Sequence, residues 1–584
     1  MSSIDWIVLF CTLTIIVLYG MYKSRTSKNL DGYFLSNRSL PWYMVLFSIM
    51  GTQASAITFL SAPGQAFTDG MRFVQYYFGL PLAMIVISIS FVPIFKKLQV
   101  FTAYEFLEQR FDVKTRTFTS ALFLLSRGFS TGISIYAPSI ILSSLLGWDI
   151  FWTNIFMGGI LIIYTVSGGA KAVAYTQQLQ LGIIFTAMFL AGFYIVHQMP
   201  ENIHFTDALF VSGASGKLNV ITTGISNEGF DWKDKYNIIS GIIGGFFLAL
   251  SYFGTDQSQV GRYLTSKSTK ESRLGLLMNG LVKIPMQFLI LLIGALLFSY
   301  YQFNHAPIFF NRAIPEKVFQ STSGDTLKQI NQEFEKVSAL QSKYAMQYAG
   351  AIQNNDQRKE IYKDSLQQAA NRINTLRNDY KTTLKNADNS IDTNDSNYIF
   401  IRYVVDHLPV GLVGLIIAVI FLASWGSIAA ALNGLASSTM VDFYLRFKKH
   451  NPHPVPLEIA EVKKYNLSKW YTLAWGIFSI FIAQFANKMG SLIEAVNVLG
   501  SLFYGVMLGV FLVAFYIKKI NGNAVFRSAV ISEVLVIILF YLDSQNIIGL
   551  GFLWLNVVGA LSVILFGLLF QLFERKRNLL HSQY

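Results

Sequence analysis

Long apolar segments alternate with polar connections along most of the chain, and about 13 of them are long enough to be transmembrane helices. A helix needs about 20 apolar residues to cross the roughly 30 Å hydrocarbon core of a bilayer. The predicted spans lie near residues 6–22, 42–65, 74–97, 117–146, 150–168, 176–197, 237–254, 275–302, 400–436, 468–487, 490–517, 525–543 and 548–572. The pattern therefore predicts an all-α polytopic membrane protein.

The apolar segment Met44–Gln65 has small and polar residues at its centre, which is unusual for a helix that faces lipid. These residues, Gly51 to Ser55, favour local unwinding. Freed backbone carbonyls are tolerated at membrane depth only where protein or a water-filled cavity satisfies them. Such a break is typical of a transport site for an ion or a solute. The alternative is an unbroken helix in close contact with a neighbour through its small residues.

Composition supports a membrane protein, because 53% of the 584 residues are hydrophobic and only 14% are charged. Lysine and arginine are concentrated in alternate connections, beginning with residues 23–41. The positive-inside rule then places the N-terminus outside and the C-terminus in the cytoplasm, with the chain in a plasma or inner membrane. The net charge of +13 reflects this topology. The lipid bilayer is thus an expected partner, and nucleic acid is not.

One long connection, residues 303–399, is polar although it falls on the predicted outer side. Apolar residues recur there at three-to-four spacing from Leu327 to Tyr348 and again from Tyr362 to Leu384, with a turn sequence at 354–356 between the two stretches. The pattern predicts an antiparallel helical hairpin outside the membrane. It is either a tolerated insertion or a docking element for an unknown partner.

Several separated motifs resemble the sodium/solute symporter family, which includes sodium-coupled galactose, proline, sialic acid, monocarboxylate and multivitamin carriers. The motifs are SGGAKAVAYT at 167–176, GTDQSQVGRYL at 254–264, LPVGLVGL at 408–415, ALNG at 431–434 and GSLFYG at 500–505. The resemblance runs from about residue 30 to 520 and excludes the outer insertion. It implies a core of two inverted five-helix repeats, each with a discontinuous first helix. The two interruptions are expected at Gly51–Ser55 and at Leu250–Thr255.

The same resemblance divides the chain into five parts. Residues 1–41 form an extra N-terminal helix and an inner loop, and residues 42–199 form the first repeat. Residues 237–302 and 400–519 form the second repeat, and 303–399 are the hairpin insertion. Residues 520–584 supply two trailing helices and a cytoplasmic tail.

The resemblance also implies Na+ as the coupling ion, held by backbone carbonyls and a pair of hydroxyls. The carbonyls fall on Gly51, Ala54 and Ala423, and the hydroxyl positions fall on Gly426 and Ser427. Two residues depart from the family pattern. Gly426 has no hydroxyl, and Gln177 stands where the family commonly has Asp. Proton coupling and uncoupled exchange therefore stay open as alternatives.

Two cations, Arg127 and Lys283, lie inside predicted spans, where a charge costs at least about 2.5–3.5 kcal/mol and marks a functional site by default. The alternative is a structural ion pair, for which the spans offer Glu494 and Glu533. Lys283 matches a family lysine near the solute site, and Arg127 resembles the arginine that binds the carboxylate in sialic acid carriers. The other expected solute contacts are Gln53, Thr58, Phe73, Tyr77 and Tyr252.

The segment 135–139, IYAPS, resembles the branch of the family that carries monocarboxylates, iodide and vitamins. A bidentate arginine in a low-dielectric cavity favours a carboxylate. We therefore expect a secondary active transporter that carries a small organic anion, with a carboxylated sugar favoured, by Na+-coupled symport and alternating access. The alternatives are a neutral sugar or polyol symporter, a proton-coupled or uncoupled carrier, and a membrane solute sensor.

An enzyme is not expected, because a catalytic constellation at membrane depth is missing from the sequence. All 7 histidines lie in connections, at span ends or in the tail. The single cysteine, Cys11, excludes an intramolecular disulfide and a cysteine metal cluster. Sodium is the one metal ion expected.

Overall fold

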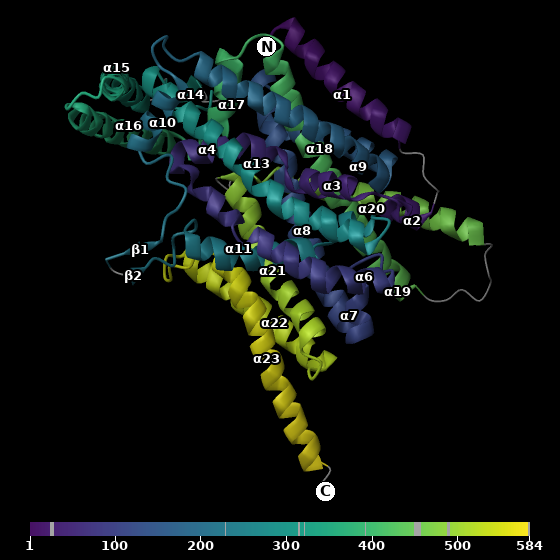
Figure 1. Ribbon diagram of the computed structural model, residues 1–584. Coiled ribbons are helices and arrows are strands. Elements are labelled where there is room, and N and C mark those ends of the chain that lie inside the picture. Colours follow the sequence, from purple (N-terminus) through teal and green to yellow (C-terminus); the bar gives the residue numbers. More distant parts are fainter. Residues whose placement is uncertain are drawn as a thin grey trace.

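The computed structural model describes residues 1–23, 29–227, 229–312, 316–319, 322–389, 391, 393–448, 457–486 and 491–581. Nearly all of this part of the chain is helical, as predicted (Figure 1). A two-stranded antiparallel ribbon, β1 (Ile225–Ser226) and β2 (Gly229–Phe230), lies in one connection. The prediction of an all-α polytopic fold is confirmed at this level.

The first half of the chain contains α1 (Ser3–Lys23), α2 (Leu30–Leu35), α3 (Trp42–Gln53), α4 (Ala56–Asp69), α5 (Leu80–Val86), α6 (Val92–Leu98), α7 (Glu105–Arg110), α8 (Val113–Leu146), α9 (Ile150–His197), α10 (Phe205–Ala214), α11 (Gly245–Thr255), α12 (Gln257–Leu264) and α13 (Thr269–Phe303). The second half contains α14 (Glu316–Phe319), α15 (Thr322–Gln353), α16 (Lys359–Ala387), α17 (Ile399–His407), α18 (Leu412–Ser438), α19 (Leu445–Phe447), α20 (Leu457–Ala483), α21 (Leu492–Tyr516), α22 (Gly522–Ser544) and α23 (Phe552–His581). Short 3₁₀ or π turns join some of them: η1 (Ser36–Arg38), η2 (Met71–Tyr77), η3 (Ile87–Phe91), η4 (Ser240–Gly244), η5 (Ser396–Tyr398) and η6 (Thr439–Tyr444).

The segment Met44–Gln65 is a broken helix, which confirms the predicted interruption. Helix α3 ends at Gln53, α4 begins at Ala56, and the two axes are bent by 60°. Ala54 and Ser55 between them leave the helical conformation, with ψ of 83° and 173°. The residues around the break are small or polar, so unwinding there exposes little apolar side-chain surface.

The second predicted interruption, at Leu250–Thr255, is wrong in its position. Those residues are helical and form the end of α11. The backbone leaves the helix one residue later, at Asp256, whose ψ is 117°. The Asp256 carboxylate accepts a hydrogen bond from the Ser258 N–H at 2.8 Å and so caps α12. The break is thus produced by a capping side chain rather than by a weak helix former.

Eight helices in the described residues are long and apolar enough to cross a membrane, and the bent pair α3–α4 would be a ninth span. The predicted spans 150–168 and 176–197 are two arms of α9, separated by a kink at Gly169, whose φ is 61°. The predicted span 400–436 is wrong as one helix. It is divided into α17 and α18, because the chain turns between His407 and Leu412 with φ of 89° at Gly411.

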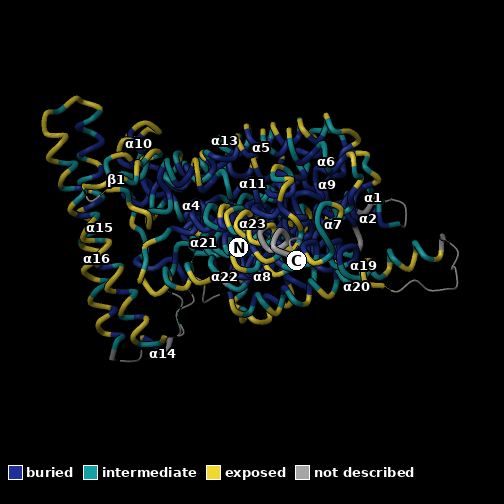
Figure 2. The backbone as a smooth tube through the Cα atoms, turned by 90° about the horizontal axis from the view of Figure 1, so that it is seen from below, coloured by how far each residue is buried: buried dark blue, intermediate teal, exposed yellow. Residues whose placement is uncertain are grey.

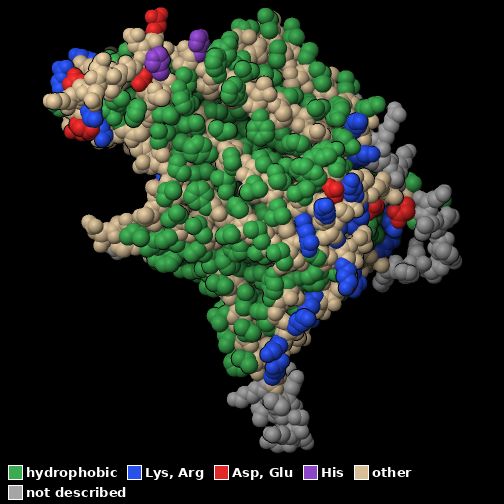
Figure 3. Space-filling model, viewed as in Figure 1, with side chains coloured by type: hydrophobic (Ala, Val, Ile, Leu, Met, Phe, Trp, Pro, Cys, Tyr) green, Lys and Arg blue, Asp and Glu red, His purple; other side chains and the backbone are tan. Residues whose placement is uncertain are grey.

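Helix α18 runs through the centre of the molecule and is almost completely buried, since 94% of its most apolar 18-residue stretch lies inside the protein. It packs against α1, α3, α8, α9 and α20. In Figure 2 the buried backbone forms one continuous body, and exposed segments gather at the hairpin and at the chain ends. A space-filling view shows a broad hydrophobic surface across this body (Figure 3).

The predicted hairpin is confirmed as α15 and α16, which project from one end of the body (Figures 1 and 2). The turn between them falls at residues 354–358, where Asn355 has φ of 49°. The periodic apolar residues face one another in a separate small core that includes Leu327, Phe334, Leu376 and Leu384. The hairpin therefore owes its stability to its own amphipathic pairing, together with its contacts with the body.

Candidate functional site

A cavity of about 110 Å³ lies beside the break in the first helix, where α3 and α4 meet α8, α11 and α21. Five of the residues predicted to contact a solute line it: Gln53, Thr58, Tyr77, Arg127 and Tyr252. Ligand pockets are commonly about 300–1,000 Å³. The cavity is therefore constricted in this structure, and admission of a sugar-sized molecule requires its walls to move.

Two other predicted residues, Phe73 and Lys283, lie behind the wall of this cavity. Phe73 is fully buried and stacks on Tyr76, with ring centroids 5.4 Å apart. Lys283 is also fully buried, and its ammonium lies 5.1 Å from the ring centroid of Tyr77 without a hydrogen-bond partner among the described residues. Both residues thus support cavity-lining tyrosines rather than line the cavity themselves.

Arg127 forms a buried ion pair with Asp256, the residue that breaks the second helix. Its Nη2 and Nε lie 2.5 and 3.1 Å from Asp256 Oδ2, and the Asp256 side chain is 0% exposed. Glu494 and Glu533 were the acids expected from the sequence, and they do not pair with Arg127. Asp256 was missed, although its place before a polar helical stretch is a capping signal.

Further contacts fix the Arg127 guanidinium at the cavity wall. Tyr504 donates to Asp256 Oδ2 at 2.7 Å and accepts from Arg127 Nη2 at 3.2 Å. The Tyr252 ring centroid lies 5.2 Å from the guanidinium carbon, within the range of a cation–π interaction. Arg127 Nη1 forms no hydrogen bond in the described part of the chain, and the side chain is 12% exposed. One edge of a rigid guanidinium is therefore free to bind a ligand.

Two of the residues predicted to bind the coupling ion, Gly51 and Gly426, lie against each other where α3 packs on α18. A Cβ built on Gly426 would lie 3.4 Å from the Gly51 carbonyl oxygen, so the two predicted positions are adjacent. Ala54 lies in the helix break, and Ala423 and Ser427 lie on α18 beside Gly426. The Ser427 hydroxyl donates to the Ser424 carbonyl at 3.1 Å.

Two glutamines on α9, Gln177 and Gln180, lie beside Gly426, where the family pattern would place a hydroxyl. Gln177 Nε2 donates to the Gly426 carbonyl at 3.0 Å, and Gln177 Oε1 accepts from Ser48 at 2.9 Å. Gln180 Oε1 lies 2.7 Å from the position of a Cβ on Gly426, and its Nε2 is buried without a hydrogen-bond partner among the described residues. Gln180 was missed by the sequence analysis, since a single amide in an apolar helix carries no recognisable signal.

The Gly51 carbonyl oxygen and the Gln180 amide oxygen both lie near Gly426, and neutral oxygens of this kind suit a monovalent hard cation. Within the described ranges, no three His, Cys, Asp or Glu side chains are placed to hold a metal ion together. The candidate ion site therefore consists of neutral oxygen donors.

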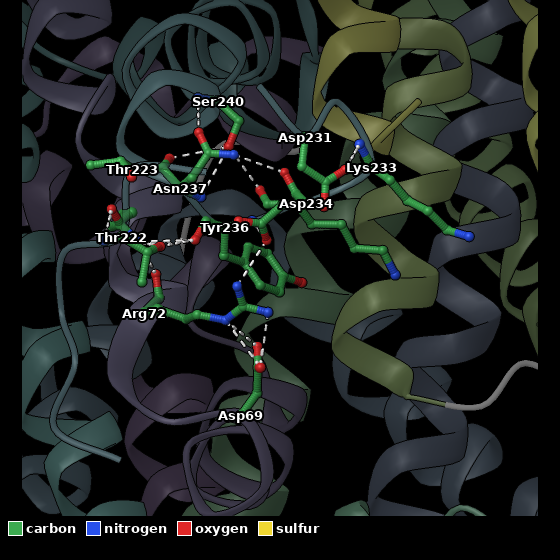
Figure 4. A network of polar contacts seen from close by, with 12 residues as sticks. Asp69, Arg72, Thr222, Thr223, Asp231, Lys233, Asp234, Tyr236, Asn237 and Ser240 are labelled. Carbon is green, nitrogen blue, oxygen red and sulfur yellow. Dashed lines mark hydrogen bonds and ion pairs between the residues drawn. The ribbon is translucent and has the colours of Figure 1, made fainter. Parts of the chain in front are cut away.

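A polar network joins η2 to the connection before η4 (Figure 4). Arg72 donates to Asp69 at 3.0 Å and to Asp234 at 2.8 Å, which ties η2 to the connection before η4. In the same connection, Lys235 pairs with Glu494 on α21. The Tyr236 ring packs edge-on against Phe73, 5.0 Å between centroids. These ion pairs tie the connection before η4 to η2 and to α21, two elements that also contribute residues to the cavity lining.

Full-length relatives are found among curated carriers. The sodium/sialic acid symporter of Proteus mirabilis (strain HI4320) is 26% identical over 571 residues, which cover 97% of this chain and 94% of that protein. The sodium/sialic acid symporter of Aliivibrio fischeri (strain ATCC 700601 / ES114) is 25% identical over 574 residues, covering 97% and 93%. A solved structure of a Na+-coupled sialic acid symporter in a substrate-bound outward-open state superposes with a TM-score of 0.73, at 24% identity over 98% of each chain. That likeness shows the fold.

The family profile described as "Sodium:solute symporter family" matches residues 33–322 and 385–532, which is well over half of the chain. The gap between the two matched segments coincides with α15 and α16. The matched family and the relatives consist of transporters rather than enzymes, and they support Na+ as the coupling ion. Together with its apolar helices, the match makes this a multi-pass membrane protein. The chain belongs to the sodium:solute symporter family.

Proposed function

We propose that this symporter carries a small organic anion together with Na+, and that the anion is a carboxylated sugar. The observation that carries the proposal is the Arg127 guanidinium, which is held at the wall of the central cavity with Nη1 unoccupied. A guanidinium in a low-dielectric site binds a carboxylate strongly and with defined geometry. The relatives named as sodium/sialic acid symporters transport a solute of this class, which supports the same assignment here.

The rest of the lining suits a hydroxylated ring. Tyr252 offers an aromatic face beside Arg127, and Gln53, Thr58 and Asn497 supply side-chain amides and a hydroxyl. The buried Gln53 Oε1 has no hydrogen-bond partner among the described residues, so it can accept a solute hydroxyl. Carboxylate recognition and ring recognition therefore occur in one cavity.

A neutral sugar or polyol is the second candidate, because Asp256 already offsets the charge of Arg127. Uptake into proteoliposomes separates the two candidates. Radiolabelled sialic acid and D-glucuronate are expected to accumulate against a gradient when Na+ is outside, and D-glucose is not. Accumulation of D-glucose with neither acid transported would instead establish the neutral-sugar carrier. Uptake that continues when choline replaces Na+ would contradict sodium coupling.

We propose that Na+ is bound by the carbonyls of Gly51, Ala54 and Ala423 and by the Ser427 hydroxyl. Gln180 Oε1 occupies the place of the hydroxyl that Gly426 lacks, since it lies 2.7 Å from the position of the missing Cβ. Proton coupling is less well supported, because the groups at this position are neutral and do not titrate near pH 7.

The transport cycle is proposed to be alternating access in a core of 13 spans with two inverted repeats, residues 42–199 and residues 237–302 with 400–519. An N-terminus on the same side as the hairpin is supported by Asp5, which accepts a hydrogen bond from the Gly411 N–H at 2.7 Å just after the insertion. Lys and Arg side chains gather on the edge opposite the hairpin in Figure 3. With the positive-inside rule, this arrangement supports an outer N-terminus and a cytoplasmic C-terminus in the cell membrane.

A further inference from the structure

A second and larger cleft, of about 880 Å³, lies between the outer hairpin and the body. One wall is formed by α15 and α16, and the other by the ends of α4, α10 and α13. Its volume is within the range of ordinary ligand pockets, in contrast to the constricted central cavity. Apart from residue 322 and residues 385–387, the hairpin helices lie outside the segments that match the family, residues 33–322 and 385–532. The cleft is thus a feature added to the family core.

The cleft is lined by four cations, Lys217, Lys363, Arg377 and Lys381, and by no Asp or Glu among the described residues. Lys363 pairs with Glu360, which lies outside the lining, at 3.3 Å. Arg377 and Lys381 share a single buried carboxylate, that of Asp395, at 2.6 Å each, so that this trio keeps a positive charge. Lys217 donates to the Thr68 carbonyl and lies 5.0 Å from the Phe298 ring centroid. A concave surface lined by one sign of charge concentrates ions of the opposite sign.

Amide side chains make up most of the remaining polar lining. Gln367, Asn371, Asn374 and Asn378 follow one another at three-to-four spacing and form a stripe along α16 that faces the body. On the other wall, Gln302 is only 4% exposed, and its Oε1 has no hydrogen-bond partner in the described part of the chain. Amides both donate and accept hydrogen bonds, which suits the hydroxyls of a sugar. Cations and amides without acids favour a polyhydroxylated carboxylate.

Helix α4 connects this cleft to the central cavity. Thr58 near its start lines the cavity, and Thr68 near its end lines the cleft. Ten residues of helix separate them by about 15 Å at 1.5 Å per residue. We propose that the cleft is an outer binding site that captures polyhydroxylated carboxylates before they reach the central cavity. The site itself stands independently of the proposed transport, although its role in delivery rests on the proposed function.

Binding of sialic acid, D-glucuronate and D-gluconate to the purified full-length protein in neutral-lipid nanodiscs tests this site. The measurement is made in an Arg127→Lys background, so that the central cavity contributes little. At least one of the three acids is expected to bind saturably, and K363Q/N374A in the cleft is expected to weaken binding at least tenfold. The matched control K385Q/N386A changes an exposed lysine and an exposed asparagine on the same helix, outside the cleft, and should leave binding unchanged.

Three results would overturn the outer site. The first is the absence of saturable binding of all three acids, and the second is equal binding by K363Q/N374A and its control. The third is stronger binding of inorganic phosphate than of the sugar acids, which would indicate a lipid-headgroup site. Circular dichroism verifies that the hairpin helices remain folded. If K363Q/N374A disturbs them, Lys217→Gln on the opposite wall replaces it with the same expectation. Na+-driven uptake is measured separately, so failure of the outer site can be distinguished from failure of the proposed transport through the central cavity.

Discussion

Arg127 and Lys283 are both buried near the central cavity, but their charges are compensated differently. Arg127 has a fully buried carboxylate partner at 2.5 Å, whereas among the described residues Lys283 has the ring of Tyr77 at 5.1 Å and no hydrogen-bond partner. Breaking a buried ion pair by removing one partner costs about 3–5 kcal/mol, because the remaining charge is left uncompensated. Truncation of Arg127 to alanine would remove the solute contact and would also leave the buried Asp256 carboxylate without its partner, so the two effects could not be separated. A charge-preserving substitution is the more informative change.

Arg127→Lys is expected to raise the Kd for a carboxylated solute at least tenfold, about 1.4 kcal/mol, while leaving neutral sugars unaffected. Lysine keeps the charge opposite Asp256, but its single ammonium has no second nitrogen in the place of Nη1 to bind the solute carboxylate. Isothermal titration with sialic acid and D-glucuronate measures the effect. Arg116→Lys is the matched control, since Arg116 is also on α8 and pairs with buried Asp442, outside the cavity lining. Equal affinities in Arg127→Lys and wild type would show that Arg127 has only a structural role.

Gly426→Ser is expected to weaken Na+ binding about tenfold, because the new side chain meets Gln180 Oε1 at 2.7 Å. Gln180→Ala should also weaken it, about 1.4 kcal/mol for one lost oxygen ligand to a cation. The double variant G426S/Q180A should recover the wild-type affinity, since the serine hydroxyl takes the place of the amide oxygen. The Na+-dependent rise in thermal stability reports binding directly. Additive losses in the double variant would show that Gln180 is not part of the ion site.

Sequence reasoning predicted these positions unevenly, for physical reasons. Gln53, Thr58 and Tyr77 were found through the resemblance to the symporter family, and all three line the cavity. Asp256 and Gln180 were missed, because their importance comes from contacts with residues more than a hundred positions away in the chain. Pairing between distant helices leaves no periodic trace in a single sequence.

The two breaks near the cavity have different causes, and only one could be located from composition. The gap between α3 and α4 lies just after Gly51 and Thr52 and includes Ser55, all of which stabilise a helix less than alanine does. The gap between α11 and α12 follows from Asp256, which caps the second helix and binds Arg127 at the same time. The apolar run before it stays helical because its side chains are buried in the body. The same carboxylate therefore fixes the position of the helix break and holds the Arg127 charge at the cavity wall.

The anchoring of the hairpin is expected to depend on pH through Asp395. Burial raises the pKa of Asp395, but the charges of Arg377 and Lys381 lower it more, so that the net pKa lies below its ordinary value of 3.8. Stabilisation by this group is present above the unfolded-state pKa and is lost as the pH falls through the lower folded-state pKa. Hydrogen exchange of α16 should therefore increase only in strong acid.

Asp395→Asn is expected to destabilise the docked hairpin by about 2 kcal/mol at pH 7, because it leaves two partly buried cations without their anion. The difference from wild type should vanish at a pH below the folded-state pKa of Asp395, where the wild-type carboxyl is protonated and as neutral as the asparagine amide. Asp379→Asn, at an exposed position on the same helix, is the control and should change stability by less than about 0.5 kcal/mol. A pH-independent difference would show that the ion pairs do not anchor the hairpin.

At the scale of the whole molecule, the central cavity is small and ion pairs join elements that contribute to its lining. Arg72 on η2 pairs with Asp234, and Lys235 pairs with Glu494 on α21. We expect these pairs to separate when the walls of the 110 Å³ cavity move to admit a sugar-sized solute. Exchange between arrangements with these pairs formed and broken is the kind of two-state change that alternating access needs.

The proposed orientation of the molecule predicts which cysteines react from outside an intact cell. The native Cys11 is first replaced by serine, which leaves a chain without thiols. Thr382→Cys on the hairpin should then react with a membrane-impermeant maleimide in intact cells, whereas Lys519→Cys, in the connection before α22, should react only after permeabilisation. Both positions are exposed, so the difference measures side rather than burial. The reverse pattern would place the hairpin in the cytoplasm, where it would face no incoming solute, and would overturn both the assigned topology and the role of the outer cleft in capture.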